Sequence, residues 1–173
     1  MQNVKLKRWI WPLKWLRRRK PSFLREIENM KILIFGLPGS GKTTLAKPLA
    51  ELLGGVHINA DEVRTHYNDW DFTPEGRMRQ AMRMKYLSDG VVKAGKIVVT
   101  DFVAPTKQAR DEFGADYTIW MNTIDQGRFE DTNKMFVKPD PADVDYEVSA
   151  WFDDTHVQLL KVLSSFMKRN DNE

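Results

Sequence analysis

Residues Lys31–Thr44 read KILIFGLPGSGKTT and carry the clearest fold signal in this chain. Its first half is an apolar run of the length of a buried β-strand. Its second half, from Gly36 to Thr43, has the spacing Gly-x-x-x-x-Gly-Lys-Thr, which is the pattern of a phosphate-binding loop. A helical pattern then runs from Thr44 to Leu53. The loop therefore stands between a strand and a helix, which is the context that the pattern requires.

The spacing of this loop has a physical purpose. Glycines let the backbone turn tightly and aim its N–H groups at an anion, and the positive end of the following helix dipole faces the same anion. Lys42 can reach the β- and γ-phosphates of ATP as a point charge, and the Thr43 hydroxyl can ligate Mg²⁺. We therefore expect ATP and Mg²⁺ as cofactors. The residues expected to hold the nucleotide are Gly36, Leu37, Pro38, Gly39, Ser40, Gly41, Lys42, Thr43 and Thr44.

Length and composition are those of one soluble globular domain. The chain has 173 residues, of which 42% are hydrophobic and 29% are charged, and both fractions are ordinary for such proteins. It has no long apolar run, so we expect no transmembrane helix. It has no cysteine, which excludes disulfides, thiolate metal sites and thiol catalysis. This composition suits a reducing compartment, and we expect a cytoplasmic protein.

Charge divides the chain into two parts. The first 20 residues carry eight Lys or Arg and no acidic residue, whereas the other 153 carry 19 basic and 24 acidic residues. We expect a basic, Trp-rich extension over residues 1–29 and a P-loop domain over residues 30–173. Three interpretations of the extension stay open: a solvated tail, a targeting segment, or an anchor on an anionic membrane surface. Residues 1–20 would also suit contact with a nucleic-acid backbone.

The rest of the chain alternates strand and helix patterns. We expect strands at 56–58, 97–101, 116–121 and 144–148, and helices from about 60, at 74–94, at 105–113 and at 151–168. This order predicts an α/β fold, a P-loop kinase three-layer sandwich with a mostly parallel sheet of about five strands and flanking helices. Residues 122–143 are expected to form a charged lid loop, in which Arg128 would bring a cation over the phosphates. The last helix is expected to bury Val157, Leu160, Val162 and Leu163.

Polar residues lie close to the carboxyl ends of the expected strands, where open α/β sheets bind their ligands. Asp61 and Arg64 are three residues apart and would share a helix face, either as part of a site or as a surface ion pair. Asp101 ends a buried strand in the manner of a Walker B segment, in which a carboxylate can hold Mg²⁺; a capping or turn aspartate is the alternative. His57 alternates with apolar neighbours, and we interpret it as structural.

Three further segments give the chain a resemblance to the adenylylsulfate kinase family, over about residues 31–150. Residues 59–64, Asn-Ala-Asp-Glu-Val-Arg, are similar to the family's Asp-Gly-Asp-Asn-x-Arg. Residues 72–77, Phe-Thr-Pro-Glu-Gly-Arg, resemble Phe-Ser-Pro-Glu-Asp-Arg, and residues 101–105, Asp-Phe-Val-Ala-Pro, resemble Ser-Phe-Ile-Ser-Pro. In the expected lid, Arg128 with Asp131 is similar to the family's Arg-Asp.

The resemblance implies transfer of the γ-phosphate of ATP to the 3′-hydroxyl of adenosine 5′-phosphosulfate (APS), which gives PAPS in sulfate assimilation. With the loop motif, it assigns catalysis to Lys42, Asp61 and Arg128, and Asp61 would orient or deprotonate the acceptor hydroxyl. Thr43, Asp61 and Asp101 are the expected Mg²⁺ ligands. The residues expected to bind the acceptor are Arg64, which would hold the phosphosulfate, Phe72, which would stack on adenine, Arg77, Gln80, Phe102 and Val103.

The chain also departs from the family pattern. Asn59 stands where the family has its first Asp, Asp101 where it has Ser, and Ala104 where some members carry a phosphorylated Ser. The family's Lys-Gly-Phe-Thr-Gly-Ile-Asp lid segment is not recognisable. Two alternatives therefore stay open: a P-loop kinase for another acceptor, such as a nucleoside, a sugar or a polynucleotide 5′ end, or a non-catalytic ATP-binding module. A homodimer is left open as well.

Overall fold

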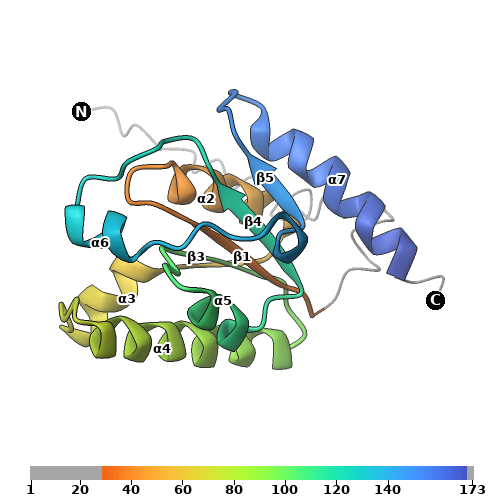
Figure 1. Cartoon of the computed structure of the whole chain (residues 1–173). Helices are drawn as coiled ribbons and strands as arrows, with labels where there is room; N and C mark the ends of the chain where they lie inside the picture. The colour runs from red at the N-terminus through yellow and green to blue at the C-terminus, as the bar shows by residue number, and fades with distance from the viewer. Residues whose placement is uncertain (1–28, 171–173) are drawn as a thin grey trace, which may run out of the picture.

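The computed structural model describes residues 29–170, which form one sheet with helices on both of its faces (Figure 1). Its five strands all run parallel, in the order β2-β3-β1-β4-β5. The predicted α/β fold and strand number are confirmed. The predictions made for residues 1–28 lie outside the described residues. The strands are β1 (Lys31–Gly36), β2 (Val56–Asn59), β3 (Val98–Phe102), β4 (Tyr117–Met121) and β5 (Tyr146–Val148).

Helices form the two outer layers of the sandwich. α2 and α7 cover one face of the sheet, and α4 and α5 cover the other (Figure 1). The helices are α2 (Lys42–Leu53), α3 (Ala60–Tyr67), α4 (Pro74–Lys93), α5 (Lys107–Phe113), α6 (Glu130–Met135) and α7 (Thr155–Asn170), with a 3₁₀ turn, η2, at Pro141–Asp143. α3 and α6 lie at the same end of the molecule, on the left of Figure 1. Between residues 29 and 170, no helix has both the length and the apolar character that a membrane span needs.

The central strand β1 explains the apolar run that precedes the loop. It lies between β3 and β4, and all six of its residues are buried. Ile32 and Ile34 join the core beneath α2 and α7, whereas Leu33 and Phe35 join the core beneath α4 and α5. A parallel strand covered on both faces needs apolar residues at successive positions rather than at alternate ones.

The start of α4 follows its local sequence signals, whereas the start of α2 differs from the prediction. The Thr73 hydroxyl accepts a hydrogen bond from the Gly76 backbone N–H (3.1 Å), and Pro74 occupies the first turn of α4. Such a cap stabilises a helix by about 1 kcal/mol. α2 begins at Lys42, earlier than predicted, and continues through Pro48 as one helix of 12 residues.

The last helix differs from its predicted extent and buried face. α7 begins at Thr155, whose hydroxyl accepts from the backbone N–H of Phe152 (2.9 Å) and donates to its carbonyl (2.7 Å). Leu159 and Leu163 are fully buried, whereas Val157 is 38% exposed. The predicted burial of Val157 is therefore wrong: the buried face of α7 contains Leu159 and Leu163, one helical turn apart, and Val157 lies two residues before Leu159, on another side of the helix.

The predicted lid also differs from a plain loop. Residues 122–143 contain α6 and η2. Within α6, Glu130 and Lys134 form an ion pair one helical turn apart (2.7 Å), a spacing that supports short exposed helices. The segment is therefore a loop that carries a helix across the end of the sheet.

Substitution of Leu159 with Ala should reduce the free energy of unfolding by about 2–5 kcal/mol, because it empties a fully buried site in the core. Substitution of Val157 with Ala, two positions earlier on the exposed side of α7, should change it by no more than about 0.5 kcal/mol. Denaturant unfolding of the full chain measures both values. Equal losses for the two variants would contradict the observed face of α7.

Candidate functional site

The phosphate-binding loop lies at the carboxyl end of β1 and leads directly into α2. Gly36 closes the strand with φ +148°, and a Cβ atom there would lie 2.6 Å from the carbonyl oxygen of Met121 in β4. Any larger residue would push the loop away from the sheet. Gly39 and Gly41 both have φ +92°, a region that glycine adopts without strain. The loop is thus built by close approach to β4 and by two left-handed turns.

Lys42 is the half-buried cation of the loop. Its Nζ donates a hydrogen bond to the carbonyl of Leu37 (2.9 Å), which holds the side chain across the loop. Burial lowers the pKa of Lys42 to about 8, and the nearby charges of Asp101 and Asp61 offset this only in part. An ammonium group that water stabilises poorly gains much from a bound phosphate, so the loop is prepared for an anion.

A cavity of about 710 Å³ opens in front of this loop. Most of the predicted nucleotide and catalytic residues line it, whereas Gly36, Leu37 and Ser40 form the buried back of the loop. The lining residues that were predicted are Pro38, Gly39, Gly41, Lys42, Thr43, Thr44, Asp61, Phe72, Arg77, Asp101, Phe102, Val103 and Arg128.

A second, smaller cavity of about 220 Å³ adjoins the first. Asp61 and Phe72 line both cavities, whereas Arg64 and Gln80 line only the second. Asp61, in the first turn of α3, is exposed. The two cavities together have the layout of a donor site and an acceptor site that meet at one carboxylate.

Thr43 and Asp101 meet beside the loop. The Thr43 hydroxyl donates to Asp101 Oδ2 (2.6 Å), and Asn59 Nδ2 donates to Asp101 Oδ2 (3.0 Å) and to Thr43 Oγ1 (3.0 Å). His57 Nε2 lies 2.6 Å from Asp101 Oδ1. The interpretation of His57 as a structural residue therefore misses its contact with a site carboxylate.

This pair of oxygen ligands suits Mg²⁺. A hydroxyl and a carboxylate are hard oxygen ligands, and Mg²⁺ in phosphate-transfer sites is held by one or two carboxylates together with substrate phosphates. Among residues 29–170, no group of three or more His, Asp or Glu side chains could hold a metal alone. Thr43 and Asp101 would therefore hold the cation together with a bound nucleotide.

The two departures at Asn59 and Asp101 are neighbours in space. β2 and β3 pair in parallel register with Asn59 opposite Asp101, and Asn59 Nδ2 bonds the Asp101 carboxylate. The family pattern has its carboxylate at position 59, on β2, whereas this chain has an amide there and a carboxylate at position 101, on β3. Both residues differ from the pattern, but one negative charge still lies beside Thr43.

The loop between α3 and α4 is held by arginines. Arg64 is buried; its Nη1 donates to the carbonyls of Asp69 (2.9 Å) and Asp71 (3.1 Å), and its guanidinium stacks over Phe72 at 4.6 Å. Burial lowers the pKa of Arg64. Part of its hydrogen-bonding capacity is thus used within the protein, and its predicted role toward a phosphosulfate stays a prediction.

Arg77 joins this loop to the lid. Its Nε donates to the Phe72 carbonyl (2.8 Å), and its Nη2 donates to Asp131 (2.7 Å) and Thr132 (3.0 Å) of α6. Asp131 is 64% exposed, and ion pairs to exposed partners contribute about 1 kcal/mol or less. Arg77, which the sequence had assigned to the acceptor, thus joins the α3–α4 loop to the lid helix through the exposed Asp131 and the buried Thr132.

Gln80 has partners inside the protein. Its Nε2 donates to the carbonyl of Ala60 (3.0 Å), and its Oε1 accepts from Arg83 Nη1 (2.7 Å). These bonds support the turn that precedes Asp61. Its predicted contact with the acceptor stays a prediction.

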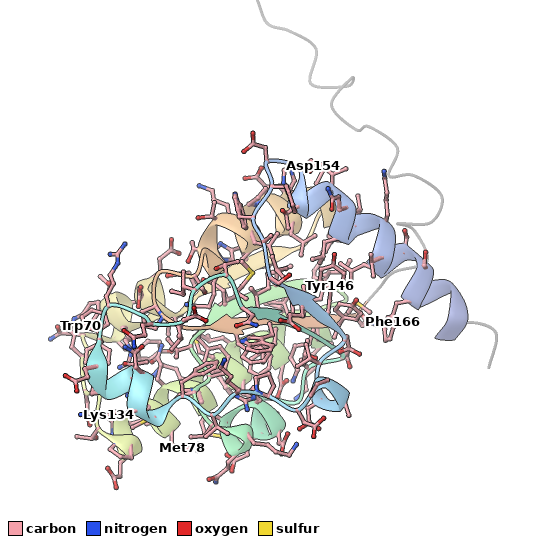
Figure 2. All side chains as sticks on the ribbon, turned by 45° about the horizontal axis from the view of Figure 1, so that its top comes forward. Trp70, Met78, Lys134, Tyr146, Asp154 and Phe166 are labelled. Atoms are coloured by element: carbon pink, nitrogen blue, oxygen red, sulfur yellow. The ribbon has the colours of Figure 1, made fainter. Side chains whose placement is uncertain are left out.

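Arg128 and two aromatic side chains complete the first cavity. Arg128 is exposed and lies against the loop, with its Nε 3.6 Å from where a Cβ on Gly39 would stand. Trp70 (50% exposed) and Phe129 (58% exposed) line the same cavity from the α3–α4 loop and from the lid. Figure 2 shows Trp70 at the end of the molecule that carries the lid helix with Lys134. Sequence reasoning missed both aromatics, although an apolar ring in a polar loop was a usable signal.

Comparison with known proteins identifies the family of this chain. The family model for adenylylsulphate kinase matches residues 28–122, more than half of the chain. A probable adenylyl-sulfate kinase of Aeropyrum pernix is 40% identical over 90 residues, which cover 49% of this chain and 49% of that protein. The adenylyl-sulfate kinase of Oceanobacillus iheyensis is 30% identical over 112 residues, 61% of this chain and 56% of that protein. The chain thus matches about half the length of these curated relatives.

Solved structures share the fold. An APS kinase of Mycobacterium tuberculosis in complex with AMPPNP and APS has a TM-score of 0.62 at 15% identity, over 79% of this chain and 98% of that chain. A shikimate kinase of Acinetobacter baumannii has a TM-score of 0.54 at 19% identity, over 81% and 94%. These similarities show the P-loop kinase fold. The family itself is shown by the family model that matches residues 28–122. The chain belongs to the adenylylsulphate kinase family.

Proposed function

We propose that this protein transfers the γ-phosphate of ATP to the 3′-hydroxyl of APS and so forms PAPS and ADP. The observation that carries the proposal is the pair of adjoining cavities that meet at Asp61, beside the phosphate-binding loop. Family membership supports the reaction, and a structural neighbour that was solved with AMPPNP and APS supports the two-site layout. ATP would occupy the first cavity and APS the second.

In the proposed reaction the acceptor oxygen forms a bond to the γ-phosphorus, and the bond from that phosphorus to the β–γ bridging oxygen breaks. Asp61 accepts the hydroxyl proton or orients the hydroxyl until the proton leaves. Lys42 and Arg128 neutralise charge on the transferring group, since such transfers depend mainly on positioning and electrostatics. Thr43 and Asp101 would hold Mg²⁺ together with the phosphates, and the bound cation would neutralise further charge.

The fold alone does not specify the acceptor. P-loop kinases of similar fold in the solved structures include a shikimate kinase and a gluconokinase. Arg64 and Gln80 also use part of their hydrogen-bonding capacity within the protein. The assay below therefore separates the reaction class from the acceptor.

The full chain with Mg²⁺ and γ-labelled ATP should transfer label to APS. Asp61→Asn should lower kcat by roughly 10²-fold or more, because it removes the group that receives the acceptor proton. Glu62→Gln, one residue further on α3 and outside both cavities, is the matched control and should keep its rate. Nucleotide binding without transfer to APS would refute the acceptor, and a screen of sugar and nucleoside acceptors would follow.

The affinity for ATP should fall as pH rises above about 8, because Lys42 has a pKa of about 8 in the free protein. Bound phosphates favour the charged ammonium and raise this pKa, so above pH 8 binding must take up a proton. The Kd for AMPPNP should then increase by up to about tenfold per pH unit, and stay flat below pH 8.

Lys42→Met should bind AMPPNP weakly, with no such increase between pH 7 and 9.5. Lys47→Met, an exposed position of the same helix, should keep the profile of the unmodified chain. A Kd that rises equally in all three proteins would contradict the assignment to Lys42.

A further inference from the structure

Asp101 is a buried carboxylate with an unusually complete set of partners. It is 1% exposed, and both of its oxygens accept hydrogen bonds. Oδ1 faces His57 Nε2 (2.6 Å), and Oδ2 accepts from Thr43 (2.6 Å) and Asn59 (3.0 Å). A buried carboxylate must be paired in this way, since an unpaired one costs several kcal/mol. An aspartate that only capped a helix or closed a turn would not need three side-chain donors, as Asp101 has.

The strand register brings these partners together. Asn59 pairs with Asp101 and His57 pairs with Val99 across β2 and β3. Side chains two residues apart in a strand share a face, so His57 and Asn59 both lie on the α2 side, where Thr43 stands in the first turn of the helix. Val99 belongs to the core on that side. The position of His57 on β2 therefore determines its contact with Asp101.

Asn59 has a fixed orientation. Its Oδ1 accepts from the backbone N–H groups of Asp61 and Glu62, each at 3.0 Å, as the cap of α3. Its Nδ2 is then turned toward Asp101 and Thr43, because the reversed amide would bring Nδ2 against two other donors. One side chain thus ties the start of the helix that carries Asp61 to the Thr43 and Asp101 pair.

The hydrogen bonds on Thr43 leave one position open. A hydroxyl has one proton and two lone pairs. The proton goes to Asp101, and one lone pair accepts from Asn59. The remaining lone pair of Oγ1 is available to a cation. This arrangement holds only while Asp101 keeps Oδ2 toward Thr43.

The torsion of an Asp carboxylate about Cβ–Cγ is soft and has no sharp rotamer. Its orientation must therefore come from hydrogen bonds at both oxygens. Asn59 Nδ2 contacts both Oδ1 (3.3 Å) and Oδ2 (3.0 Å) of Asp101, so Asn59 alone does not determine which oxygen faces Thr43. The contact from His57 Nε2 to Oδ1 (2.6 Å) leaves Oδ2 as the oxygen that faces Thr43.

We propose that His57 is a positioning residue, which by occupying Oδ1 holds Oδ2 of Asp101 toward Thr43 and so prepares the pair for the Mg²⁺ of the nucleotide. This inference rests on the proposed function only in requiring that ATP binds with Mg²⁺; it requires no particular acceptor. Residues that orient metal ligands in this way typically change metal affinity by 10–100-fold when removed.

The test measures how much Mg²⁺ strengthens the binding of AMPPNP to the full chain, as the ratio of the Kd without Mg²⁺ to the Kd with it. His57→Leu should lower this ratio by about tenfold or more, with the Mg²⁺-free Kd unchanged. His57→Gln should restore it, because the Gln amide can place a donor near the position of the imidazole Nε2. His57→Asn is shorter and should not. His66→Leu, at an exposed histidine of α3, is the matched control.

A merely structural role for His57 predicts a different pattern. If His57 only attaches the edge strand β2 to the sheet, His57→Leu would weaken binding equally with and without Mg²⁺, and that result would overturn the proposal. An unchanged ratio would overturn it as well. Should His57→Leu fail to fold, the comparison of His57→Gln with His57→Asn decides, and equal ratios would refute the idea.

The APS transfer assay fails separately from this one. A chain that binds AMPPNP with a Mg²⁺-dependent Kd but does not phosphorylate APS would refute the proposed acceptor and leave the His57 inference to be judged by its own ratios. A chain that does not bind AMPPNP at all would refute both.

Discussion

The central strand β1 is buried along its whole length, and its position places the phosphate-binding loop. It lies between β3 and β4, with helices over both faces of the sheet. Its carboxyl end therefore opens between the ends of its neighbours. The phosphate-binding loop begins there, and Gly36 lets it pass against Met121 of β4. Charge, backbone N–H groups and the dipole of α2 then converge on one point.

Two kinds of contact organise the site around that point. Hydrogen bonds of 2.6–3.0 Å join Thr43, Asp101, Asn59 and His57, with the buried Asp101 at their centre. Arg77 joins the lid helix α6 to the α3–α4 loop, through the exposed Asp131 and the buried Thr132. Polar networks around a buried group are costly to break, whereas a pair to an exposed partner contributes little. The Thr43 and Asp101 pair is thus preorganised.

The departures from the family pattern become intelligible in three dimensions. Asn59 and Asp101 are far apart in sequence but pair across adjacent strands. Exchanging which strand carries the carboxylate keeps one negative charge beside Thr43 and avoids two carboxylates at one position, which would repel each other. The amide that remains at residue 59 also caps α3, so the change keeps the helix that presents Asp61.

Much of the architecture could be predicted from sequence, for physical reasons. The run from Lys31 to Gly36 is apolar at successive positions, and the loop spacing after it has few structural solutions, so the central strand, the loop and the α/β class followed. The cap at Thr73 fixed the start of α4 because the signal is local. Local signals failed at the lid, where α6 is a short helix, and at α7, where packing against the core beneath α2 buries Leu159 and Leu163 and leaves Val157 exposed.

Sequence patterns were enough to identify the side chains suited to phosphate and its cation: Lys42 and Thr43 of the loop, and the carboxylates Asp61 and Asp101. Which of the candidate side chains meet, and which already have partners within the protein, follows from the folded arrangement. His57 contacts Asp101 because parallel register sets β2 against β3, and Gln80 is bound to Ala60 because α4 packs beneath α3. Such contacts depend on strand pairing and helix packing between residues distant in the chain, and a single sequence carries no local signal of either.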